Sequence, residues 1–134
     1  MDRWGHILNR RGIKIAEQLI VNNMIIHPKQ FQENTQRIVN IICDYYHVDV
    51  DTIMKGTDRF AVNVLARQMS IYFVCSNYPS LKKHIVGELF GRHRCTILYA
   101  KGKIDDMIEV DKQIKKDYDR LCKRIDLMYK GQEL

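Results

Sequence analysis

Residues 79–104 read PSLKKHIVGELFGRHRCTILYAKGKI, and they hold two apolar patterns of helical spacing that meet at a glycine. Ile85 and Leu89 lie one helical turn apart, so they predict the inner face of a helix of about ten residues that stops at Phe90–Gly91. The second pattern predicts a helix that begins near His93 and buries Ile97, Leu98 and Ile104. Two helices joined by such a tight turn have the outline of a helix-turn-helix.

The borders of this unit carry their own local signals. Tyr78–Pro79–Ser80 predicts a turn, with Ser80 as the N-cap of the first helix. Gly102 weakens the second helix, because glycine costs a helix interior about 1 kcal/mol relative to alanine. We therefore expect a bend or joint near residues 101–105.

Positive charge is concentrated in this same segment. Residues 79–104 hold six lysines and arginines against one acid, Glu88, in a chain whose net charge is +6. Residues 1–31 carry a smaller excess of +3, whereas residues 32–78 and 105–134 each sum to −1. A localised basic surface indicates a polyanion as partner. A merely solvated charged face is the alternative that charge alone leaves open.

The rest of the chain also reads as helix. Apolar residues recur at helical spacing over residues 11–24, 29–46, 49–55, 59–77 and 106–130. We therefore expect an all-α fold of about six helices, with the apolar 59–77 segment as its central helix. In the long C-terminal helix a heptad repeat predicts one packing or dimerising stripe, formed by Met107, Ile114, Leu121 and Met128.

Several classes of protein are disfavoured by the composition. No apolar run approaches the 18 or so residues of a membrane span, and the N-terminus lacks the apolar core of a signal peptide, so a cytoplasmic protein is expected. The four cysteines lie far apart and predict reduced thiols, with Cys43 and Cys75 filling the core. No nucleophile–base arrangement stands out, and His84, His93 and Cys95 match no closed zinc spacing. We therefore expect neither an enzyme nor a bound cofactor or metal.

The turn itself carries side chains suited to nucleic acid. Arg92 and Arg94 have guanidinium forks that fit guanine edges or phosphates, while His93, Cys95 and Thr96 are short enough to approach bases. The start of a helix also favours a phosphate through its free N–H groups and positive dipole end. Periodicity alone is equally compatible with an ordinary helical hairpin that has a charged corner.

A resemblance to a known family favours a nucleic-acid-binding turn over an ordinary helical hairpin. Residues 65–104, LARQMSIYFVCSNYPSLKKHIVGELFGRHRCTILYAKGKI, resemble the C-terminal DNA-binding domain of the bacterial replication initiator DnaA, a Trp-repressor-like helix-turn-helix. The matching positions are Ala66–Arg67–Gln68, Ser80–Leu81, Phe90–Gly91–Arg92, Thr96–Ile97–Leu98 and Lys103–Ile104. The resemblance extends over roughly residues 35–128 and consists of many positions in order, not of one short motif.

This resemblance implies a double-stranded DNA-binding protein in replication or transcription regulation, associated with the nucleoid. The residues expected to contact DNA are Arg59, Arg67, Lys82, Lys83, Arg92, His93, Arg94, Cys95, Thr96, Lys101 and Lys103. Residues 35–134 would form the domain, and residues 1–34 a helical N-terminal extension. A Walker-type phosphate loop is absent from the sequence, so the ATPase module of the initiator is not expected.

Departures from the family pattern affect specificity. His93 stands where the family has a base-contacting Asp, Arg94 where it has His, and Cys95 where it has Thr. Exchanging a carboxylate acceptor for cationic or donor groups is expected to change which bases are preferred. Leu65 also replaces a family arginine of the basic loop.

A second function class stays open at this stage. In this alternative the chain keeps the scaffold without DNA binding, and uses its N-terminal helix or the 107–128 stripe to bind a protein partner or a second copy of itself. Tight self-association without DNA binding would favour this alternative.

Overall fold

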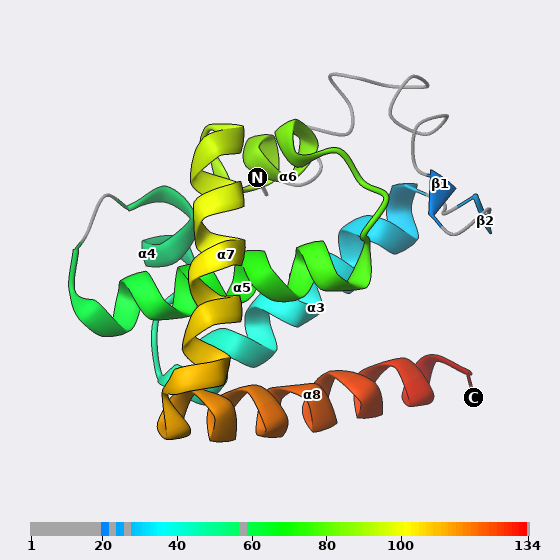
Figure 1. Cartoon of the computed structure of the whole chain (residues 1–134). Helices are drawn as coiled ribbons and strands as arrows, with labels where there is room; N and C mark the ends of the chain where they lie inside the picture. Colours follow the sequence, from blue (N-terminus) through cyan, green and yellow to red (C-terminus); the bar gives the residue numbers. More distant parts are fainter. Residues whose placement is uncertain (1–19, 22–23, 26–27, 57–58, 134) are drawn as a thin grey trace.

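The computed structural model describes residues 20–21, 24–25, 28–56 and 59–133, and nearly all of them are helical. The helices are α3 (Pro28–Tyr46), α4 (Val50–Lys55), α5 (Ala61–Asn77), α6 (Lys83–Phe90), α7 (Arg94–Val110) and α8 (Lys112–Glu133). These six helices of the described residues confirm the all-α expectation. Figure 1 shows α6 beside one end of α7 and α8 lying across its other end. None of the described helices has both the length and the apolarity that crossing a bilayer demands.

Helix α5 forms the centre of the core. Every residue from Met69 to Cys75 is buried, because α3, α4, α6 and α7 all pack against this helix. A helical segment that is buried on all sides belongs in the interior of a domain, and the sequence prediction of a central helix here is confirmed. Cys43 and Cys75 are buried in the core, as predicted.

Local caps set the ends of α3 and α4. The chain leaves α3 through His47, whose φ of 57° lies in the left-handed region, and the Val48 N–H donates to the Cys43 carbonyl at 3.0 Å. This is the hydrogen bond of a Schellman motif with histidine in place of the usual glycine. Asp49 then caps α4 by accepting from the Thr52 N–H at 3.1 Å.

Helix α8 is fastened to α3 by a buried carboxylate. Asp117 is 4% exposed and accepts hydrogen bonds from the Tyr45 hydroxyl at 2.6 Å, the Tyr46 hydroxyl at 3.0 Å and Gln113 Nε2 at 3.0 Å. Burial, and secondly the Asp117 charge, raise the pKa of Tyr46, so its hydroxyl stays a donor. The apolar stripe of α8 is buried on the same side, at Ile114, Leu121 and Ile125. The stripe therefore packs within the chain.

The prediction of a helix over residues 11–24 is wrong at residues 20–21 and 24, which the structure describes. The other residues of this range lie outside the described part of the chain. Ile20–Val21 (β1) and Met24–Ile25 (β2) pair as short antiparallel strands, with Ile20 opposite Ile25. The β-branched residues here favour a strand over a helix. The domain boundary expected at residue 34 stays a prediction.

The structure also corrects two local expectations. Helix α6 begins at Lys83 with Lys82 as its N-cap, so Ser80 is not the cap. The chain still turns at Tyr78–Ser80, because the buried Leu81 donates its N–H to the Tyr78 carbonyl at 3.0 Å. No joint forms at residues 101–105: α7 runs unbroken through Gly102, because the buried Ile97, Ala100 and Ile104 outweigh one glycine.

The break between the last two helices falls instead at Asp111. Its carboxylate accepts from the N–H groups of Gln113 at 2.9 Å and Ile114 at 3.1 Å, which starts a new helix. The final helix is therefore Lys112–Glu133, and Met107 belongs to α7 and not to the last helix as predicted.

Replacing Asp117 by alanine should lower the free energy of unfolding by about 2–3 kcal/mol, because hydrogen bonds to a buried charged acceptor are lost together. Urea unfolding followed by circular dichroism measures this. The control is Asp119→Ala, which removes an exposed ion pair with Lys115 and should cost less than about 1 kcal/mol. Equal effects of the two substitutions would contradict the role given to Asp117.

Candidate nucleic-acid interface

The turn between α6 and α7 depends on two glycines. Gly91 adopts the left-handed conformation with φ 64°, and the Arg92 N–H after it donates to the Gly87 carbonyl at 2.8 Å. A β-carbon on Gly87 would collide with the Arg92 carbonyl oxygen, so only glycine allows this close approach. The predicted stop at Phe90–Gly91 is confirmed, although α6 has 8 residues instead of about ten.

His93 caps the start of α7. Its Nδ1 atom accepts a hydrogen bond from the Cys95 N–H at 3.1 Å, and its backbone carbonyl accepts from Thr96 at 2.9 Å. An acceptor role for Nδ1 means that a neutral ring carries its proton on Nε2. The predicted start of the helix near His93 is thus confirmed, with a cap that sequence reasoning did not identify.

The first turn of α7 projects outward while the opposite side of the helix is anchored. His93, Arg94, Cys95 and Thr96 are all exposed. On the other side of the helix Ile97, Ala100 and Ile104 are buried against the core, and α7 packs on both α5 and α6. Four predicted contact residues are therefore presented together on a rigidly held helix end.

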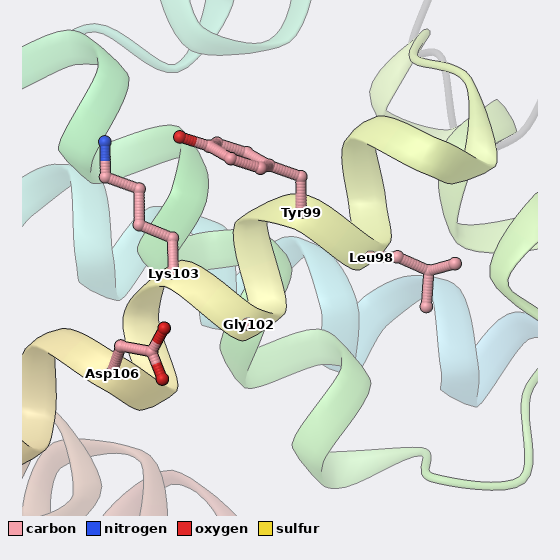
Figure 2. A pocket seen from close by; sticks show the side chains of 5 residues that line it. All are labelled: Leu98, Tyr99, Gly102, Lys103 and Asp106. Atoms are coloured by element: carbon pink, nitrogen blue, oxygen red, sulfur yellow. The ribbon is translucent and has the colours of Figure 1, made fainter.

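Leu98 does not point inward as predicted. It is 52% exposed, because it lies on the same outer side of α7 as Tyr99, which is 61% exposed. Figure 2 shows that Leu98, Tyr99, Lys103 and Asp106 project from α7 around a shallow hollow that includes Gly102. The Lys103 ammonium lies 5.8 Å from the centre of the Tyr99 ring. Tyr99 was missed by sequence reasoning, although its position three residues after Thr96 on the helix was a usable signal.

Three predicted arginines from two parts of the chain line one open hollow. Arg59, which precedes α5, and Arg67, which lies on α5, line a hollow of about 510 Å³ together with Val64 and Arg92. Arg92 also donates from Nη2 to the Gly56 carbonyl at 2.7 Å. Arg92 thus ties the turn to the α4–α5 connection, a structural role that the sequence did not indicate.

The remaining predicted lysines lie away from the α6–α7 turn, at the start of α6 and two helical turns into α7. Lys82 is exposed at the start of α6, while Lys83 and Lys101 are partly buried. Burial raises the pKa of the Cys75 thiol, and the charges of Lys83 and Lys101 oppose that rise. Both lysines therefore lie near the same end of α5, which places their positive charges on one side of the molecule.

The His93 cap makes a stability prediction. His93→Ala should lower the free energy of unfolding by about 1 kcal/mol, because the Cys95 N–H loses its acceptor. His93→Asp should match or exceed the wild type, because aspartate is a preferred cap and its charge suits the helix dipole. Urea unfolding of the three proteins measures both effects. A fully neutral alanine substitution would show that the hydrogen bond to Nδ1 does not stabilise α7.

The comparisons with known proteins point to one family. Residues 35–104 match the family model described as bacterial dnaA protein helix-turn-helix. This match runs from within α3 to within α7 and leaves α8 outside.

The curated relatives carry the same description. The chromosomal replication initiator protein DnaA of Flavobacterium psychrophilum is 28% identical over 121 residues, which are 86% of this chain and 23% of the relative. The protein of that name in Gloeothece citriformis is 31% identical over 97 residues, 72% of this chain and 21% of the relative. The protein of that name in Jannaschia sp. is 32% identical over 91 residues, which are 66% of this chain and 18% of the relative. This chain thus spans less than a quarter of the length of these relatives.

Proposed function

This chain belongs to the bacterial DnaA helix-turn-helix family, and from that premise we propose that it binds double-stranded DNA through the first turn of α7. The observation that carries the proposal is the run of four exposed residues, His93 to Thr96, at the capped start of an anchored helix. A helix-turn-helix places this part of its second helix in the major groove. We further propose a regulatory or replication-accessory role on the nucleoid.

Base reading is assigned to the exposed side of α7. The Arg94 guanidinium suits the O6 and N7 acceptors of guanine, and Thr96 and Cys95 are short enough for close approach to base edges. Leu98 and Tyr99 add apolar surface further along the same side, which suits contact with a thymine methyl group.

The His93 geometry gives the proposal a direction in specificity. Because Nδ1 is occupied by the cap, a neutral His93 offers only its Nε2–H, which is a donor. The aspartate that the family resemblance places here is an acceptor. We therefore infer a shift of preference away from cytosine and adenine amino groups and toward guanine or thymine acceptors at this base pair.

Phosphate contacts are assigned to the basic residues around the turn. Arg59 and Arg67 share a hollow with Arg92, which suits a backbone phosphate approaching the α4–α5 connection. Lys82 and Lys83 at the start of α6, and Lys101 and Lys103 further along α7, are assigned additional phosphate contacts. The self-association alternative has less support, because the stripe it requires is buried within the chain at Ile114, Leu121 and Ile125.

Anisotropy titration against duplexes selected from a random pool tests the proposal. Arg94→Ala should weaken binding to a selected duplex by about 5–100-fold, the loss expected for a bidentate base contact. Affinity should also fall as salt rises, because counterions are released on binding.

Arg37→Ala is the matched control, since Arg37 is an exposed arginine on α3, away from the turn. It should bind like the wild type. Arg92→Ala is a poorer probe, because it also removes the hydrogen bond to the Gly56 carbonyl. Affinity that ignores salt, or that is unchanged by Arg94→Ala, would overturn the proposal.

Thiol chemistry offers an independent test at Cys95. This thiol is exposed, whereas Cys43 and Cys75 are buried and Cys122 is partly buried. Burial, assisted by nearby aspartates, raises the pKa of Cys43 to about 12, and burial also raises the pKa of Cys75 and Cys122. Since the thiolate is the reactive form, iodoacetamide should modify Cys95 first.

Bound duplex should slow this alkylation, and the alkylated protein should bind duplex more weakly. Mass spectrometry of tryptic peptides locates the modification, and anisotropy measures the binding. Cys95→Ser is the control, because it should bind duplex before and after the reagent equally well. Alkylation of Cys95 at an unchanged rate in the presence of saturating duplex would place DNA elsewhere on the protein.

A further inference from the structure

The outward side of α8 is strongly cationic. Its exposed residues between Lys112 and Lys130 include seven basic side chains and only two acids, Asp119 and Asp126. The basic ones are Lys112, Lys115, Lys116, Arg120, Lys123, Arg124 and Lys130. The opposite side of the same helix is buried at Ile114, Leu121 and Ile125. Helix α8 therefore presents a mostly polar, positively charged side to its surroundings, on which Leu127 is also exposed.

Four lysines form a straight line on this side. Lys112, Lys116, Lys123 and Lys130 fall within a narrow sector of the helix, because their spacings of 4, 7 and 7 residues are close to whole turns. We call these four residues the α8 lysine stripe. It is about 27 Å long at the helical rise of 1.5 Å per residue. The stripe lies in a helix that the family match does not reach.

The neighbouring cations are already engaged, whereas the stripe is not. Lys115 pairs with Asp119 at 3.1 Å, Arg120 donates to the Tyr45 hydroxyl at 3.3 Å, and Arg124 lies 5.2 Å from the centre of the Tyr45 ring. Within the part of the chain that the structure describes, the side chains of the four stripe lysines form no hydrogen bond or ion pair. The stripe is therefore available to an anionic partner.

The stripe and the first turn of α7 lie at opposite ends of the molecule. Figure 1 shows α7 running from the turn beside α6 to α8. Helix α7 has 17 residues, which corresponds to a length of about 25 Å. Its far end carries exposed acids at Asp105, Asp106 and Glu109, and exposed Asp111 follows. The distance between the two basic surfaces, and the repulsion by these carboxylates, therefore keep a polyanion bound at one surface from continuing to the other.

We propose that the α8 lysine stripe binds a second segment of double-stranded DNA, so that one chain bridges two duplexes. A line of lysines about 27 Å long matches the regular, closely spaced phosphates of a duplex backbone. A bilayer is a poorer fit, because an interfacial helix inserts its apolar side into lipid and α8 buries that side against its own chain. The bridging function rests on the proposed function, which supplies the first duplex.

A bead assay with the full chain tests the proposal. A biotinylated duplex carrying the selected site is immobilised, the protein is added, and retention of a fluorescent second duplex is measured. Replacing all four stripe lysines by glutamine should reduce that retention by more than about tenfold, because four phosphate contacts are lost. Affinity for a single short duplex, measured by anisotropy, should stay unchanged.

The matched control replaces the same four lysines by arginine, which keeps the charge and should keep the bridging. Undiminished bridging by the glutamine variant would overturn the proposal. An oligomer detected by light scattering would then assign the bridging to self-association. If the glutamine variant lost binding to phosphatidylglycerol vesicles but kept bridging, the result would overturn the proposal and assign the stripe to a membrane. Absence of binding to even one duplex by the wild type would instead overturn the proposed function.

Discussion

The carbonyl oxygen of Arg92 passes Gly87 so closely that no β-carbon fits between them. This approach, together with the hydrogen bond from the Arg92 N–H to the Gly87 carbonyl and the left-handed Gly91, sets the direction in which the chain enters α7. Burial of Ile97 and Ile104 on α7 then holds the rest of the helix in that direction. The exposure of the first turn of α7 follows from these constraints and not from the polarity of its residues alone.

Arg92 extends this constraint to the arginine-lined hollow of the proposed interface. Its hydrogen bond to the Gly56 carbonyl joins the turn to the end of α4, and its side chain lines the hollow shared with Arg59 and Arg67. The surface proposed for DNA is thus assembled from segments more than 30 residues apart, and its α7 part is held by the turn and by the burial of Ile97 and Ile104 without a ligand. Preorganisation of this kind reduces the ordering cost of binding.

The sequence contained most of the helix-turn-helix but little of its support. Helical periodicity and Gly91 were sufficient to predict the α6–α7 unit, because both signals are local. Leu98 is exposed, contrary to the prediction, because an apolar residue at the edge of a helical pattern can lie on either side of the helix. Helix α7 continues through Gly102 because the burial of its apolar side outweighs the local cost of one glycine. The Arg92–Gly56 bond spans 36 residues and has no local signature. The His93 cap was missed because histidine is not among the common capping residues.

Charge counted along the sequence also concealed a feature of the fold. Residues 105–134 sum to −1, which suggested an unremarkable segment, but that sum combines the acidic end of α7 with the basic outer side of α8. Folding separates the two groups at the Asp111 break, and it withdraws the Asp117 carboxylate from the surface of α8 into its contact with α3. Four of the acids that offset the lysines in sequence, at the end of α7 and at the Asp111 break, therefore lie between the two basic surfaces, and their repulsion favours two separate duplex segments over one continuous one.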